Sequence, residues 1–411
     1  QWEGAFDVVK DPRQVTRYAF LSDFTSADTE TQDVDWIRRL HFNAVQFYDW
    51  MSRHDMLLPP QERYLDPMGR ETDLAAIRAK IAACKAAGIR PIAYGAVYAA
   101  AKELFAEHPE WAIQIPGREA TEIRCQYVLD LSRPEVQDYA YESVAKILRS
   151  ANIKYVKWDM NRQLSDLGST YLDEDSQQEL FHRYVLGMYA MQERLVQEFP
   201  DLLLENCSGG GARFDPGMLY YSPQIWCSDD TDAIERLEIQ EGTALIYPLC
   251  VMGAHVSVCP NHTVGRVTPF TTRGHVALAG TFGYELDITK LPEEERKLIP
   301  EQTAMYHKYH ELIRDGEYYR ILSYRENHRS DCWAVASEDK NEVLVTYVQV
   351  LAQANMPSRK VRLRGFDPAK KYRLEGTDEV YSGEMLMNAG FRMKDFWGDF
   401  VSRLYHFIAV D

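Results

Sequence analysis

The 411-residue sequence contains no apolar run of the roughly 18 to 20 residues that a membrane-spanning helix requires. Its N-terminal stretch, QWEGAFDVVKDPRQ, lacks the basic-then-apolar pattern of a targeting segment. Basic residues are in deficit, because the formal net charge is -16, whereas nucleic acids and anionic membranes both require a basic face. We therefore expect neither a nucleic acid nor a membrane as a partner.

Paired cysteines and nucleotide-binding turns are also missing. The seven cysteines are scattered, with no Cys-x-x-Cys pair and no zinc-like spacing to histidine, which indicates reduced thiols and a cytoplasmic protein. No Gly-x-Gly-x-x-Gly turn follows the first predicted strand, and no lysine-serine pair follows the glycines of CSGGGARFDPG (207–217), as a P-loop requires. We expect no metal and no organic cofactor.

Short apolar runs, each followed by an amphipathic stretch, are typical of β/α units. The helical pattern is clearest over 73–88 and 132–150, and eight runs are predicted strands: 18–24, 44–50, 89–98, 153–159, 202–208, 224–230, 254–258 and 281–287. This order predicts an α/β protein whose residues 1–316 form a (β/α)8 TIM barrel. An open doubly wound sheet is the alternative. Short runs separated by turn residues predict a small C-terminal antiparallel β-sandwich domain over 317–411.

Acidic residues gather where the predicted strands end, which is the place of the active site in a barrel. Such carboxylates either coordinate hard cations or catalyse reactions on a neutral substrate such as a sugar. Metal sites usually add histidines or closely spaced ligands, whereas tyrosines and tryptophans beside these acids would pack on pyranose rings. We therefore favour a carbohydrate substrate. The acids are Asp23, Asp49, Asp159, Glu205, Asp229, Asp230, Glu285 and Asp287, and neighbouring aromatic residues include Tyr48 and Trp226.

Asp159 in YVKWDMNR (155–162) fits the nucleophile of a retaining glycosidase, which must stay ionised. Lys157 lies two residues earlier on the same predicted strand, and Arg162 follows closely, so both cations would favour the ionised carboxylate. The alternative is that the three residues form a structural ion-pair cluster.

Asp229 fits the second carboxylate, the acid/base, because repulsion within the acidic cluster SDDTD would raise the pKa of at least one member. Asp230 and Asp232 are rivals that the spacing does not eliminate, although Asp232 also fits a helix N-cap. Between the two catalytic candidates, the glycines of CSGGGARFDPG would let the backbone approach a sugar hydroxyl, or form only a tight turn.

Long segments of the chain resemble the α-galactosidases of glycoside hydrolase family 36, over about residues 108–411. They are YVKWDMNR, CSGGGARFDPGMLYYSPQIWCSDDTDAIERLEIQ, YPLCVMGAHVS, PNHTVGR and TFGYELDITKLPEEE. The resemblance implies a retaining α-galactosidase barrel with Asp159 as nucleophile and Asp229 as acid/base. It also implies that the sugar contacts Arg124 of RCQYVLD, Lys157, Cys207 and Gly210.

The N-terminal third, about residues 15–107, is different. RYAFLSDF, VQFYDWMSRHD and IAYGAVYAA resemble the dextranase-type enzymes of glycoside hydrolase family 66, so the sequence looks like a chimera of two families. The paired acids with which the galactosidases recognise the sugar on strand two are represented here by Asp49, preceded by Tyr48. Family 36 enzymes normally also carry an N-terminal β-domain, which we do not expect here, and we expect a monomer or small homo-oligomer.

These features predict a retaining α-glycosidase of the α-galactosidase type, which hydrolyses terminal, α-1,6-linked α-galactosides of oligosaccharides. One alternative is an enzyme acting on α-1,6-glucans or isomaltooligosaccharides. An alternative of another class is a non-catalytic carbohydrate-binding or scaffold protein. His255 and His262 have no carboxylate partner nearby in the sequence and are predicted to be hydrogen-bonded scaffold residues.

Overall fold

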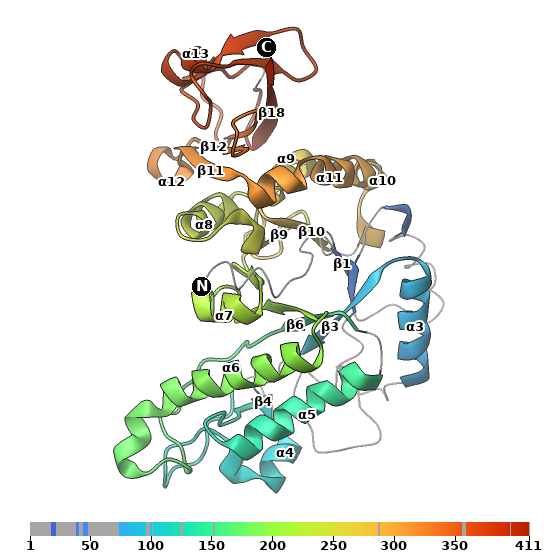
Figure 1. Ribbon diagram of the computed structural model, residues 1–411, viewed down its shortest axis with the longest axis vertical. Coiled ribbons are helices and arrows are strands. Elements are labelled where there is room, and N and C mark those ends of the chain that lie inside the picture. Colours follow the sequence, from blue (N-terminus) through green and yellow to red (C-terminus); the bar gives the residue numbers. More distant parts are fainter. Residues whose placement is uncertain are drawn as a thin grey trace. The chain divides into compact units, whose positions relative to one another are not determined.

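The chain forms two compact units in a computed structural model (Figure 1), and these are Gln1–Trp226 and Cys227–Asp411. The structure describes residues 18–21, 38–40, 44–47, 74–95, 99–100, 102–123, 126–150, 153–286, 288–355, 359–394 and 396–410. No helix within these ranges is long and apolar enough to cross a membrane.

The first unit contains a parallel sheet whose strands follow one another in chain order. In the described part of this unit these strands are β1 (Tyr18–Leu21), β2 (Ala44–Phe47), β3 (Arg90–Gly95), β6 (Tyr155–Trp158), β7 (Leu203–Asn206) and β8 (Gln224–Trp226). Each lies inside one of the first six predicted runs. Since all pairs are parallel, the carboxyl ends of these strands share one edge of the sheet.

Helices connect these strands, as the amphipathic stretches predict. They are α3 (Leu74–Ala86), α4 (Lys102–Glu107), α5 (Pro134–Ser150), α6 (Leu180–Glu198) and α7 (Pro216–Tyr221), with 3-10 turns η3 (Pro109–Trp111) and η4 (Glu174–Glu179). A short antiparallel pair, β4 (Ala99–Ala100) and β5 (Tyr127–Val128), precedes α5. The last turn of α3 is followed by Gly88 at φ +72°, a left-handed conformation that ends helices.

Helices α5 and α6 pack against each other (Figure 1), and the contact is fixed by charge pairs and by one close approach. Arg149 Nε donates to Glu198 Oε1 at 2.6 Å, and Arg194 Nη1 donates to Asp138 Oδ1 at 2.6 Å. A Cβ atom at Gly187 of α6 would lie 1.9 Å from the carbonyl oxygen of Leu131. Only glycine therefore fits at this point of the helix.

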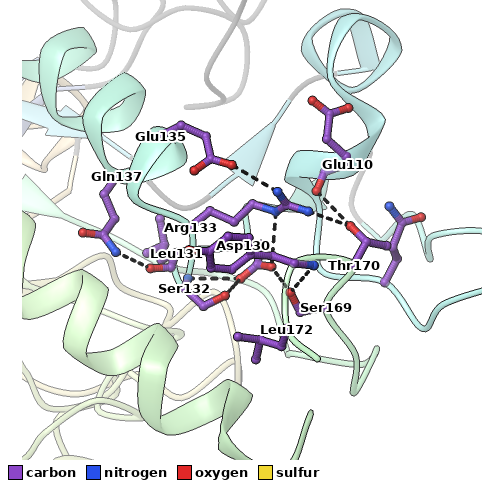
Figure 2. A network of polar contacts seen from close by, with 12 residues as sticks. Glu110, Asp130, Leu131, Ser132, Arg133, Glu135, Gln137, Ser169, Thr170 and Leu172 are labelled. Carbon is purple, nitrogen blue, oxygen red and sulfur yellow. Dashed lines mark hydrogen bonds and ion pairs between the residues drawn. The ribbon is translucent and has the colours of Figure 1, made fainter. Parts of the chain in front are cut away.

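A buried polar network ties the start of α5 to the segment that follows β6 (Figure 2). Asp130, which is fully buried, accepts hydrogen bonds from the Ser132 backbone at 3.0 Å, the Ser132 hydroxyl at 2.5 Å and the Ser169 hydroxyl. Arg133 Nε lies 3.7 Å from Asp130 Oδ2, and its Nη2 donates to Thr170 Oγ1 at 2.8 Å. These contacts satisfy the buried carboxylate and fix the two segments together.

A second set of contacts anchors the same segment closer to β6. Asp166 accepts from the backbone N–H of Thr121 at 2.9 Å and from its hydroxyl at 2.8 Å. Arg162 Nη2 donates to the Thr121 carbonyl at 2.5 Å. The chain that leaves β6 is thus attached at both ends to residues that precede α5.

The second unit begins with two further parallel strands, β9 (Met252–Ser257) and β10 (Thr281–Glu285), which lie within or overlap the last two predicted runs. Its helices are α8 (Glu235–Ala244), α9 (Phe270–Ala277), α10 (Glu293–Arg296) and α11 (Ile299–Asp315), with 3-10 turns η5 (Leu249–Val251) and η6 (Ile288–Lys290). Phe282 and Tyr284 of β10 face α11, where Phe282 stacks on Tyr306 and Tyr284 donates to Gln302 at 2.6 Å. Alternate residues of β10 therefore face the other side of the sheet.

An antiparallel sheet follows α11, in the order β11-β12-β13-β18-β15-β16, with a separate pair β14-β17. The strands are β11 (Glu317–Leu322), β12 (Ser330–Ala336), β13 (Glu342–Gln349), β14 (Lys360–Val361), β15 (Lys371–Leu374), β16 (Val380–Ser382), β17 (Phe391–Arg392) and β18 (Val401–Val410). Short helices α12 (Tyr324–Asn327) and α13 (Gly383–Asn388) connect some of them. The core of the antiparallel sheet is a buried apolar cluster that includes Val345, Tyr372 and Phe407. The predicted domain boundary at residue 316 stays a prediction.

Candidate active site

One face of the sheet in the first unit carries a buried charged cluster at β6 and β7. Lys157 of β6 pairs in register with Glu205 of β7, and Lys157 Nζ lies 3.8 Å from Glu205 Oε1. Tyr155, two residues earlier on β6, donates its hydroxyl to Glu205 Oε2. Burial, together with the charge of Glu205, raises the pKa of Tyr155 well above its ordinary value, so the phenol remains a donor.

The same face places Lys157 over an aromatic ring. Lys157 Nζ lies 3.8 Å from the centroid of the Trp226 ring at the end of β8, a cation-π contact worth about 2 kcal/mol when it is desolvated. Trp226 is 2% exposed and packs with Tyr155 and Cys207 in one apolar cluster. The structure thus brings together three of the residues that the sequence assigned to sugar binding, namely Lys157, Cys207 and Trp226.

Asp159 directly follows β6 and is 3% exposed. Its Oδ1 accepts from the backbone N–H of Met160 at 2.8 Å, and its Oδ2 accepts from Asn161 Nδ2 at 2.5 Å. Both donors come from the next two residues, so the orientation of the carboxylate is fixed locally. Arg162, the other cation predicted beside Asp159, donates to the carbonyl oxygens of Gln163 and Thr121.

The glycine-rich segment after β7 folds back onto the residues that follow β6. Gly209 and Gly210 have φ of +52° and +80°, which allows the chain to turn tightly here. Gly209 N–H donates to Asn161 Oδ1 at 3.0 Å, and the Ser208 hydroxyl donates to the Met160 carbonyl at 2.9 Å. Asn161 therefore links the turn to Asp159. The tight-turn interpretation explains Gly209, while a sugar contact at Gly210 stays a prediction.

In the second unit, the segment between β8 and α8 separates the three acids that the sequence left as rivals. Asp229 is exposed. Asp230 Oδ1 accepts the backbone N–H of Asp232 at 3.0 Å. Asp232 is 1% exposed, accepts the N–H groups of Ile234 and Glu235 at 3.0 and 3.1 Å, and pairs with Arg266. Asp232 therefore accepts backbone N–H groups where α8 begins, although the N-cap residue itself is Ile234, which makes no side-chain cap bond. The choice of Asp229 over Asp230 stays a prediction.

A histidine-carboxylate pair also lies on β9 and β10. His255 Nε2 is 2.8 Å from Glu285 Oε2, and the His255 side chain is fully buried. His255 is in register with Gly283, so His255 and Glu285 both lie on the face of the β9–β10 pair opposite Tyr284. The sequence predicts His255 as a scaffold residue without a nearby carboxylate, because Glu285 is distant in the sequence. The pairing could have been inferred from one signal, namely that both residues follow the alternation of neighbouring strands.

The predicted sugar contacts Tyr48, Asp49 and Arg124 and the strand-end acids Asp23 and Asp287 lie outside the described residues. The described candidates fall in two units, with Asp159 and its neighbours in the first and Asp229 in the second. The catalytic pairing of Asp159 with Asp229 therefore stays a prediction. Among the residues that the structure describes, no group of three or more histidine, cysteine, aspartate or glutamate side chains is arranged to hold a metal ion.

Two protein-family models match the chain. The model described as Melibiase matches residues 96–316, and the Glycosyl hydrolase family 36 C-terminal domain matches residues 330–407.

Curated relatives agree with these matches. The chain is 49% identical over 308 residues to α-galactosidase AgaA of Geobacillus stearothermophilus, and 48% identical over 308 residues to α-galactosidase Mel36A of Lactobacillus acidophilus. Each alignment covers 75% of this chain and 42% of the relative. The chain thus spans less than half the length of these relatives.

Solved structures show the same fold. The crystal structure of the family 36 α-galactosidase AgaA superposes with a TM-score of 0.89 and 39% identity, covering 97% of this chain and 56% of that one. Variants of AgaA in complex with raffinose and with stachyose give TM-scores of 0.91 and 0.88 at 38% identity, with the same coverage. The predicted fold class is confirmed: an α/β domain with a parallel barrel-type sheet, followed by a C-terminal antiparallel β-domain.

Proposed function

Since the chain belongs to the melibiase family, the α-galactosidases of glycoside hydrolase family 36, we propose that it is a retaining α-galactosidase. The observation that carries this proposal is Asp159, a buried carboxylate oriented by two hydrogen bonds, beside the cluster of Lys157, Cys207 and Trp226. A retaining glycosidase needs such a fixed carboxylate to attack the anomeric carbon.

In the proposed mechanism, Asp159 and Asp229 act in two displacements. In the first, an Asp159 oxygen forms a bond to the anomeric carbon while the glycosidic bond breaks, and the Asp229 carboxyl gives its proton to the leaving oxygen. In the second, Asp229 takes a proton from water, the hydroxide oxygen bonds to the anomeric carbon, and the bond to Asp159 breaks. The product keeps the α configuration.

The sugar would be held by residues from several strands. Lys157 supplies an ammonium group held between Glu205 and the Trp226 ring, so it can donate to a hydroxyl without losing its partners. Cys207 and Gly210 would border the sugar at the end of β7. Arg124, Asp49 and Tyr48 complete the proposed set from the sequence resemblance.

The proposed substrates are oligosaccharides with a terminal α-1,6-linked galactose. Variants of AgaA have been crystallised in complex with raffinose and with stachyose, and the chain superposes on both. Hydrolysis of p-nitrophenyl α-galactoside and raffinose by the purified chain tests the proposal. Turnover of neither galactoside, with retained binding of a galactose-like inhibitor, would instead favour a non-catalytic carbohydrate-binding protein.

A second candidate, an α-1,6-glucan or isomaltooligosaccharide-acting enzyme, rests on the N-terminal third. The family match starts at residue 96, and the likeness of the preceding segments to family 66 enzymes is an expectation from the sequence alone. The superposition on the family 36 α-galactosidase AgaA covers 97% of the chain and gives the chimera no support. Residues before residue 96 include Tyr48 and Asp49, which would determine whether the site binds galactose or glucose. Activity on isomaltose and the p-nitrophenyl α-glucoside, without activity on the galactosides, would establish this candidate.

The remaining predictions are also proposals. We place the protein in the cytoplasm, since Cys227, Cys250, Cys259 and Cys332 are free thiols in the structure. We also propose that the protein is a monomer or small homo-oligomer, and that its catalytic domain ends at residue 316. Gel filtration and limited proteolysis test the last two.

A further inference from the structure

The loop that carries Asp229 is clamped by one buried arginine. Arg236 is the second residue of α8 and is 3% exposed. Its Nη2 donates to the Ser228 carbonyl at 2.6 Å, and its Nε donates to the Asp230 carbonyl at 2.5 Å. These two carbonyl groups belong to the residues immediately before and after Asp229.

The same guanidinium also fixes the loop to its surroundings. Arg236 Nη1 donates to the Gly253 carbonyl in β9 at 3.0 Å and contacts Cys227 Sγ at 2.9 Å. A guanidinium is suited to this position because its planar group presents five N–H donors in fixed directions. A single side chain thus joins α8, β9 and both neighbours of Asp229.

A second contact holds the far side of the loop. The Ser257 hydroxyl at the end of β9 donates to the Thr231 carbonyl at 2.8 Å, and Asn261 Nδ2 contacts Thr231 Oγ1 at 3.2 Å. The backbone on both sides of Asp229 is therefore held by side chains from outside the loop. The Asp229 side chain itself is exposed, so burial does not fix its position.

We infer that Arg236 is a positioning residue for the acid/base, and that it acts by holding the backbone that flanks Asp229. This inference rests on the proposed function. A general acid must reach the leaving oxygen within hydrogen-bond distance, and a displacement of about 1 Å can cost about 10²-fold in rate. Arg236 does not need to touch the substrate to have this effect.

The test compares two leaving groups in Arg236→Met. Raffinose has a sugar leaving group that needs a proton, whereas the phenolate of 2,4-dinitrophenyl α-galactoside leaves without one. We expect kcat/KM for raffinose to fall by about 10²-fold, and that for the activated galactoside by less than about tenfold. Arg236→Lys keeps the charge but not the contact with both carbonyl groups. Its selective loss of kcat/KM for raffinose should lie between those of the wild-type chain and Arg236→Met.

The matched control is Arg266→Met, since Arg266 pairs with Asp232 and Glu235 at the same helix end but not with the neighbours of Asp229. In this variant, kcat/KM should change by the same factor for both substrates or not at all. An equal fall on both substrates in Arg236→Met, or a selective loss in Arg266→Met, would overturn the inference. If the wild-type chain cleaves neither galactoside, the proposed function itself fails.

Ser257→Ala keeps the inference testable if Arg236→Met does not fold, as judged by circular dichroism. This variant removes only the hydroxyl that holds the Thr231 carbonyl. A selective loss of about three- to tenfold on raffinose is expected, since loop displacement is smaller when the arginine remains. Equal rates on raffinose before and after this substitution would count against positioning by the loop backbone.

Discussion

Asp159 and Asp229 each follow a buried strand, but their surroundings differ. Asp159 is 3% exposed, and its own carboxylate oxygens accept hydrogen bonds from Met160 and Asn161. Asp229 is exposed, and the structure holds the backbone on either side of it. The difference fits the two proposed duties, because a nucleophile must keep one geometry, while an acid/base must reach first the leaving oxygen and then the attacking water.

The largest expected effect comes from removing the fixed carboxylate. Asp159→Ala should lower kcat by on the order of 10⁴-fold or more, because no nucleophile remains. Azide should restore part of the rate with an aryl α-galactoside and give the β-galactosyl azide, which chromatography detects. Asp173→Ala, an exposed acid in the same connection, is the control and should keep full activity. An unaffected rate in Asp159→Ala would remove this residue from the mechanism.

Removing the exposed carboxylate should have a smaller and more selective effect. In Asp229→Ala, kcat/KM for raffinose should fall by about 10²- to 10⁴-fold, with much less change for an activated aryl galactoside, because general acid catalysis is lost. Asp230→Asn keeps the oxygen that accepts the Asp232 N–H and serves as the control. The assignment would pass to Asp230 if the control, rather than Asp229→Ala, showed the selective loss.

The local hold on Asp159 can be weakened without removing it. Asn161→Ala deletes the donor to Asp159 Oδ2 and the acceptor of Gly209 N–H, and we expect kcat to fall by about 10- to 10²-fold on both classes of leaving group. Gln163→Ala, which changes an exposed side chain nearby, is the control. A selective effect on raffinose alone would mean that Asn161 serves the acid rather than the nucleophile.

Substitutions of the acids in the SDDTD segment should differ in their effect on the free energy of unfolding. Asp232→Ala removes the oxygen that accepts two N–H groups at the start of α8 and a buried partner of Arg266, so the free energy of unfolding should fall by about 2–4 kcal/mol. Asp229→Ala should lower it by less than Asp232→Ala does, because the Asp229 side chain is exposed. Urea unfolding measures both. Equal losses would show that Asp229 also has a structural role.

Sequence reasoning succeeded where the signal is local. The alternation and length of apolar runs predicted the eight parallel strands of the described part, and strand ends predicted where Lys157 and Asp159 lie. The segment SDDTD did not distinguish its acids. Their roles depend on which backbone N–H each accepts, and the bonds that Asp232 accepts depend on where α8 begins.

Contacts between distant residues could not be predicted. The ion pair of Lys157 is with Glu205, across the pairing of β6 with β7, rather than with the nearby Asp159. Arg236 reads in the sequence as one more charge of an acidic helix start, and only the fold brings its guanidinium to the neighbours of Asp229. Strand register decides these contacts, and a one-residue shift would reverse which side chains meet.

The Lys157–Trp226 contact has an optical consequence. A full positive charge 3.8 Å from an indole ring changes the energy of its excited state, so the emission of Trp226 should report on the position of the ammonium group. A ligand hydroxyl that accepts a hydrogen bond from this ammonium group would alter the charge felt by the ring and so shift the fluorescence. Seven other tryptophans contribute background, and the difference between the wild-type chain and Trp226→Phe isolates the signal. The pair thus provides a built-in spectroscopic probe of the candidate active site that needs no chromogenic substrate.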